Sequence, residues 1–325
     1  MMEVQKYLFE VIKSRISEQY RLVDVIENLL DVSVDSAYRR IRGEKELSFS
    51  EVQKICRHFH LSLDEIMNFN PASGVSFQYM PVDLAEQSSY MQYILRLSET
   101  LSGLAATKDG ELFVTAQDIP FYHFLPHTEL LFFKLYVWHD IINRERISFC
   151  EFCDRLDRDA IVSVYDKMFR DYMKIPSREI WTNQTPDTIL RLLDFYAETG
   201  AFDNPETFAL LLKQLTALLD TVNTYANSGY KDDKRQTPFL LYLCSVDLEN
   251  NYMLARRGEH YACTIKLYTV NSVSTDNATL CGETAKWINH LILKSTLISG
   301  TASKECFRFF QTSKNKIEEL IHKME

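Results

Sequence analysis

Apolar residues recur every three or four positions along the first 70 residues of this 325-residue chain. One face of an α-helix repeats at that spacing, so the pattern predicts short amphipathic helices packed around a small core. Five helices are predicted, over about 4–16, 22–30 and 34–42 and from Ser48 and Ser62 onward. Only a tight turn separates the second helix from the third, which is typical of a helix-turn-helix.

Polar residues at the predicted helix ends support these boundaries. Ser33 is a suitable N-cap for the third helix, and Gly43 tolerates the left-handed conformation that ends a helix. Ser48–Glu51 and Ser62–Glu65 are capping boxes, in which a hydroxyl and a carboxylate each bind a backbone N–H of the first turn. The sequence thus predicts where the third, fourth and fifth helices begin.

A change of composition marks a domain boundary near residue 70. The segment Asn68–Gly74 is polar and contains the helix breakers proline and glycine. We predict a helix-turn-helix domain over 1–70, a linker over 71–80 and a larger domain over 81–325. Two domains are expected because single cores seldom grow past roughly 250–300 residues.

Most of the larger domain has helical periodicity, and alternating polarity becomes common only after about residue 237. The predicted elements are helices over about 82–106, 130–143 and 159–173, a helical hairpin with starts at 185 and 204, a strand over 111–116, strands over 239–246, 252–255 and 262–270, and helices over 281–296 and 303–323. The predicted fold is therefore mainly α: a five-helix helix-turn-helix domain plus a larger helical domain with a small antiparallel β-meander near the C-terminus. The helix over 82–106 is either a core helix or a dimeric coiled coil.

Charge and cysteine usage narrow the class of protein. The net charge is −9, and the first 70 residues, with ten Lys or Arg and twelve Asp or Glu, contribute −2 of it. Affinity for nucleic acid would have to come from a local basic face. Seven irregularly spaced cysteines, no secretory leader pattern, and a most apolar segment (130–142) too short to span a bilayer predict a cytoplasmic protein with reduced thiols and no membrane contact.

The third helix offers such a basic face. The major groove of DNA admits one helix, and side chains in the N-terminal half of that helix reach the base edges. We predict base contacts from Ser33, Asp35, Ser36 and Arg39. Phosphate contacts are predicted from Tyr38, Arg40, Arg42 and Lys45, which would position the protein without reading sequence. The alternative is that the arginines form only the solvated face of a short helix.

Residues 3–68 resemble the DNA-binding domain of the Cro/repressor-like (XRE-type) superfamily, and within it the BetR-type domain of bacterial regulators. The resemblance rests on Asp35-Ser-Ala-Tyr-Arg-Arg-Ile-Arg-Gly-Glu-Lys-Glu-Leu-Ser48 and on His60-Leu-Ser-Leu-Asp-Glu-Ile66. It implies sequence-specific binding to double-stranded DNA, usually as a homodimer, with the third helix in the major groove. Three positions depart from the family pattern. Many members have a glycine at the turn and a small residue inside the second helix, whereas this chain has Asp31 and the bulky Ile26 nearby. Arg42 replaces the usual glutamate before the closing glycine.

Other candidate chemistry has less support. Cys150 and Cys153 have the spacing of redox and zinc motifs, but no second ligand pair accompanies them, so we predict small apolar residues and expect no metal or cofactor. His123 and His127 flank an aromatic run that forms either core or the wall of a ligand pocket. Because no known catalytic motif is found, the chain is not expected to be an enzyme.

The sequence therefore predicts a transcriptional regulator. The larger domain would mediate dimerisation or bind a small-molecule or protein effector. One alternative is a ligand- or protein-binding module with a degenerate helix-turn-helix, which the acidic balance of the first 70 residues favours. A second alternative is an enzyme with an unrecognised site in residues 81–325.

Overall fold

The computed structural model describes residues 2–16, 21–59, 61, 63–67, 74–82, 87–143, 147–268, 271–300 and 303–324. The chain divides into two compact units, Met1–Phe77 and Gln78–Glu325. Among the described residues, no helix is both long and apolar enough to cross a membrane.

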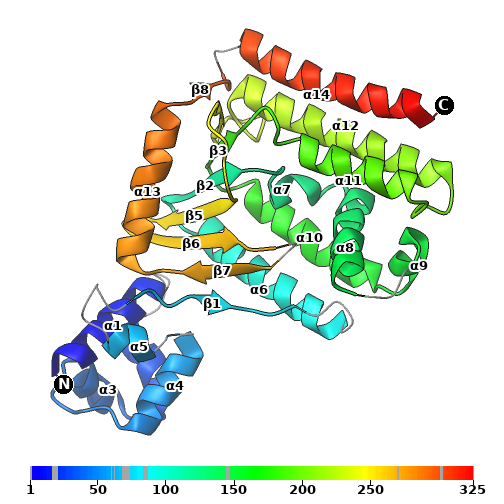
Figure 1. Ribbon diagram of the computed structural model, residues 1–325. Helices are drawn as coiled ribbons and strands as arrows, with labels where there is room; N and C mark the ends of the chain where they lie inside the picture. Colours follow the sequence, from blue (N-terminus) through cyan, green and yellow to red (C-terminus); the bar gives the residue numbers. More distant parts are fainter. Residues whose placement is uncertain are drawn as a thin grey trace. The chain divides into compact units, whose positions relative to one another are not determined.

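The described part of the first unit holds the five predicted helices, drawn in blue and light blue in Figure 1. They are α1 (Met2–Arg15), α2 (Leu22–Leu30), α3 (Val34–Ile41), α4 (Phe49–Phe59) and α5 (Leu63–Met67). Ile12, Ile26 and Ile55, one from each of α1, α2 and α4, are fully buried at the centre of their core. Ala37 is the fully buried residue of α3, so this helix packs closely through a small side chain.

In the described part of the second unit, eight strands form one mixed sheet in the order β1-β7-β6-β5-β2-β3-β4-β8. The strands are β1 (Gln78–Tyr79), β2 (Gly110–Ala116), β3 (Ser177–Trp181), β4 (Phe239–Leu243), β5 (Tyr252–Arg257), β6 (His260–Lys266), β7 (Ser272–Thr275) and β8 (Thr296–Leu297). β2, β3 and β4 run parallel to one another, and the remaining pairs are antiparallel.

This sheet corrects the predicted fold class. The predicted antiparallel meander exists as β5–β7, but it continues into a parallel centre and does not stand alone as a small element. The prediction failed because the pairs β2–β3 and β3–β4 join strands about 60 residues apart, and the two-residue strands β1 and β8 are too short to show any alternation.

Helices cover both faces of the sheet (Figure 1). They are α6 (Gln87–Ala105), α7 (Phe121–Phe124), α8 (Thr128–Ile142), α9 (Phe149–Asp154), α10 (Arg158–Tyr172), α11 (Asp187–Glu198), α12 (Pro205–Ser228), α13 (Ala278–Leu293) and α14 (Ser303–Met324). Side chains of a strand alternate between faces. Accordingly, Leu112 and Val114 of β2 join the large helical core, whereas Phe113 joins a smaller cluster under α13.

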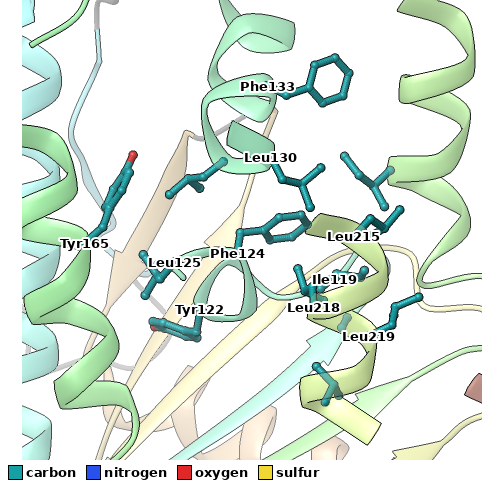
Figure 2. Packing of buried hydrophobic residues seen from close by; sticks show 14 of the residues in the cluster. Ile119, Tyr122, Phe124, Leu125, Leu130, Phe133, Tyr165, Leu215, Leu218 and Leu219 are labelled. Atoms are coloured by element: carbon teal, nitrogen blue, oxygen red, sulfur yellow. The ribbon is translucent and has the colours of Figure 1, made fainter. Parts of the chain in front are cut away.

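The aromatic run after β2 is core. Figure 2 shows Phe124 of α7 between Leu130 of α8 and Leu215 of α12, and Phe124 and Leu130 are fully buried. The helix predicted over 82–106 is likewise a core helix, since Ile94 and Leu101 of α6 are buried in the same cluster. These positions account for the aromatic run without a ligand pocket and for α6 without a coiled coil.

A buried ionic network lies at the centre of this sheet. The carboxylate of Glu179 on β3 is inaccessible to solvent and accepts hydrogen bonds from the Tyr172 hydroxyl and the Trp181 indole N–H, both at 2.9 Å. His123 Nε2 lies 2.9 Å from the same carboxylate. The buried Nζ of Lys231 donates to the carbonyls of Tyr172 and Ile175 at 3.1 and 2.8 Å. The network satisfies polar groups that would otherwise destabilise the core.

Candidate nucleic-acid interface

The turn between α2 and α3 consists of three residues, 31–33. Asp31 ends α2 in the left-handed conformation, with φ 55° and ψ 55°, and its N–H donates to the Glu27 carbonyl. Ser33 then caps α3, because its hydroxyl accepts a hydrogen bond from the N–H of Ser36 at 3.3 Å. The predicted N-cap is confirmed, and Asp31 occupies a conformation that glycine adopts more readily.

The C-terminal end of α3 closes at Gly43, as predicted. Gly43 has a φ of 75°, and the N–H groups of Glu44 and Lys45 both donate to the Arg39 carbonyl, at 2.8 and 3.1 Å. These bonds satisfy a carbonyl that the helix itself leaves free. α3 therefore has two well-defined ends, and the chain turns sharply into the loop that leads to α4.

Arg40 does not lie on the outer face of α3. Its side chain is 5 % exposed, and its guanidinium binds Glu51 Oε1 on α4 with Nη2–Oε1 at 2.6 Å. The guanidinium also donates to the carbonyl and the hydroxyl of Ser36. Arg40 therefore does not present its charge at the surface, where the predicted phosphate contact would require it.

Glu51 has two functions in this arrangement. Its second oxygen, Oε2, accepts the N–H of Ser48 at 2.8 Å, and its own N–H donates to the Ser48 hydroxyl, which confirms the capping box at 48–51. Burial raises the pKa of the Glu51 carboxyl, but the hydrogen bonds from Arg40 and Ser48 lower it by more than burial raises it. The net pKa therefore lies below its usual value. The second predicted capping box, at 62–65, lies outside the described residues.

The remaining predicted contact residues are at least partly accessible. Ser33, Asp35, Arg39, Arg42 and Lys45 are exposed, and Ser36 and Tyr38 are half-buried. The Arg42 guanidinium forms two hydrogen bonds with Glu44, at 2.7 and 3.0 Å. The charge of Arg42 is therefore paired with that of Glu44.

Two candidate residues were not predicted from the sequence. Arg21, just before α2, is exposed and donates to the Tyr38 hydroxyl at 2.7 Å, so the N-terminal end of α2 contributes a further cation beside the arginines of α3. Gln5 on α1 hydrogen-bonds to the backbone of the last turn of α3 and of the loop that follows it. Neither pairing has a local signal, since the partners are separated by 17 residues for Arg21 and by 35 or more for Gln5.

Family comparison supports a regulator domain in this part of the chain. Residues 10–136 match the BetR domain family. That family comprises regulator domains of the helix-turn-helix type. The matched segment begins within α1 and continues through α6, β2 and α7 into α8, well beyond the helix-turn-helix itself. No curated protein and no solved structure matches the chain.

In the second unit, one shallow groove lies between α11 and α14. It has a volume of about 230 Å³ and is lined by Asp187, Leu190, Arg191, Asp194, Lys316 and Leu320. Lys316 binds Asp187 at 2.7 Å, and Lys323 binds Asp194 at 2.8 Å, so most of the charges that line the groove are already paired.

Within the described residues no cluster of His, Cys, Asp or Glu side chains is suited to a metal ion. Cys150 is exposed and Cys153 is buried.

Proposed function

We propose that this chain is a sequence-specific DNA-binding transcriptional regulator that inserts α3 into the major groove of double-stranded DNA. The observation that carries the proposal is a helix-turn-helix with a capped, outward-facing third helix inside a segment that matches the BetR domain. The XRE-type resemblance of residues 3–68 supports the same mode of docking. The proposal assigns no catalytic step, metal or cofactor to the chain.

The geometry divides the proposed contacts between bases and backbone. Arg39 is the proposed base reader, since its long exposed side chain suits two parallel hydrogen bonds to guanine. Ser33 and Asp35 stand at the N-terminal end of the same helix. Ser36 is a weaker base contact, because its hydroxyl already binds Arg40. Tyr38, Arg42 and Lys45, joined by Arg21, are proposed to contact phosphates.

We further propose that the regulator acts in the cytoplasm as a homodimer. Two copies of α3 would then read half-sites roughly 34 Å apart. The second unit would supply the dimer contact or bind the effector.

Selection of bound sequences from random duplex DNA by the purified full chain tests the proposal. We expect the wild type to enrich one motif. Arg39→Ala should relax one position of that motif and cost roughly 1–3 kcal/mol of binding free energy. Arg191→Ala, at an exposed arginine of α11, is the matched control and should leave the motif unchanged. Absence of any enriched motif with wild-type protein at low salt would remove the proposed function.

A further inference from the structure

Gln5 uses both ends of its side-chain amide to hold the loop that follows α3. Its Nε2 donates to the carbonyls of Arg40 and Lys45, at 2.7 and 2.8 Å. Its Oε1 accepts the N–H of Leu47 at 3.0 Å. One α1 side chain thus binds the backbone in the last turn of α3, at Arg40, and at two points of the loop that joins α3 to α4, at Lys45 and Leu47.

This loop is where order matters for contact with DNA. It contains the left-handed Gly43, and its residues Glu44, Lys45 and Glu46 are exposed. An exposed loop of this kind samples many conformations unless other groups fix it. Because Gln5 already orders the loop in the folded protein, the loss of conformational entropy occurs during folding. It therefore does not reduce the free energy of DNA binding.

The donors of Gln5 also change the local electrostatics. The C-terminal end of a helix carries partial negative charge on its free carbonyl groups, which disfavours a nearby phosphate. The Gln5 amide donates to one carbonyl of the last turn of α3, at Arg40, and to one carbonyl of the following loop, at Lys45. The lysine of this loop, Lys45, is exposed and has no ion-pair partner among the described residues, so its ammonium is available to a phosphate.

We propose that Gln5 is a positioning residue for DNA binding: it holds the α3–α4 loop so that Lys45 meets a phosphate of duplex DNA. This role rests on the proposed function. Gln5 acts through Lys45 and the loop backbone, and it takes no part in reading bases.

A double-mutant cycle on the full chain tests this role. Gln5→Met keeps the size of the side chain and removes both polar ends. We expect it to weaken binding to all sequences alike, several-fold, and to reduce the slope of log K against log salt by about one per protomer, as loss of one phosphate contact does. Lys45→Ala should have the same effect, and the double variant should bind no more weakly than Lys45→Ala alone.

Gln92→Met is the matched control, because Gln92 is exposed on α6 of the second unit. It should change neither affinity nor salt slope. Amide exchange in the free protein supplies a readout without DNA: Gln5→Met should accelerate exchange at Leu47 and leave the core amide of Ile55 protected.

The outcomes separate the two claims. Failure of the wild type to bind any duplex removes the proposed function and with it this role. Wild-type binding with additive losses in the double variant, an unchanged salt slope in Gln5→Met, or unchanged exchange at Leu47 would overturn the role of Gln5 alone. A loss of folded protein in Gln5→Met would also lower protection at Ile55 and so be recognised. In that event Gln5→Glu, which retains the acceptor for Leu47 and loses both donors, should give the same reduced salt slope.

Discussion

Arg39 and Arg40 are neighbours in the sequence, yet Arg39 is exposed and Arg40 is buried. Successive helical residues point about 100° apart, and Arg40 follows the fully buried Ala37 by three positions, on the inward side of α3. Helical spacing alone thus separates an outer from an inner arginine. It does not identify the partner, because the contact with Glu51 depends on how α3 packs against α4.

Arg40→Met should destabilise the first unit. Removal of the guanidinium leaves the Glu51 carboxylate, whose side chain is 18 % exposed, without its partner. We expect a loss of roughly 2–3 kcal/mol, somewhat less than for a fully buried ion pair. Native-state amide exchange of α2 and α3 measures this loss in the first unit alone. The exposed neighbour gives the control, since Arg39→Met should change stability by no more than about 0.5 kcal/mol. Equal losses in the two variants would contradict the structural role of Arg40.

Asp31 carries a conformational cost that glycine would avoid. Its φ of 55° lies in the left-handed region, which disfavours residues with a Cβ atom. Asp31→Gly should leave the first unit equally stable or increase its stability by about 0.5 kcal/mol. Glycine relieves the left-handed strain, but its greater freedom in the unfolded chain offsets part of that gain. Asp31→Ala should destabilise it by about 1 kcal/mol. The same amide-exchange measurement ranks the three proteins, and an alanine variant more stable than the glycine variant would disprove the argument.

At the scale of elements, the sequence predicted the helix ends, which depend on neighbouring residues, better than the strands, which depend on distant partners. The caps at Ser33, Ser48 and Gly43 were predictable because each acts within a few residues of itself. β2 was predictable from its apolar run, whereas β3 was not. Its sequence, Ser-Arg-Glu-Ile-Trp, contains two charged residues, and nothing local indicates that the Glu179 carboxylate contacts His123 from another segment.

Glu179→Gln tests how much this network stabilises the second unit. Burial raises the pKa of the Glu179 carboxyl, but His123 and then Lys231 lower it, and the net pKa lies below its usual value. The substitution removes a buried charge from its partners, so we expect a loss of roughly 2–4 kcal/mol. Thermal unfolding of the full chain measures it, with Glu318→Gln, at an exposed position of α14, as the control.

The same lowered pKa fixes the sign of a pH dependence. A carboxyl whose pKa is depressed by folding stabilises the protein above its unfolded value of about 4.3, and this contribution disappears as the pH falls through the folded value. The stability difference between wild type and Glu179→Gln should therefore be largest near neutral pH and shrink in acid. A difference that grows on acidification would mean that the carboxyl is protonated in the folded protein.

At the scale of the whole molecule, the net charge of −9 limits how the protein can bind a polyanion. Unspecific attraction over the whole surface is excluded, so binding depends on a few local cations. Arg21, Arg42 and Lys45 are the cations proposed to contact phosphate in one protomer, and Arg42 must exchange Glu44 for phosphate to do so. The acidic remainder of the chain then repels DNA outside the correct docking geometry, which favours specific over unspecific complexes.

This charge distribution makes the proposed dimer measurable. Each neutralised phosphate contributes about 0.9 to the salt slope, so three cations predict a slope of roughly −3 for one protomer and roughly −5 for two. A homodimer also requires a two-fold symmetric motif with half-sites roughly 10 base pairs apart. Salt titration on the selected sequence, with light scattering of the complex, measures the slope and the stoichiometry together. A single asymmetric half-site bound by one protomer, with a slope near −3, would contradict the dimer. It would leave DNA recognition by α3 intact, because the slope counts the phosphates that are neutralised, whereas the motif reports the bases that are contacted.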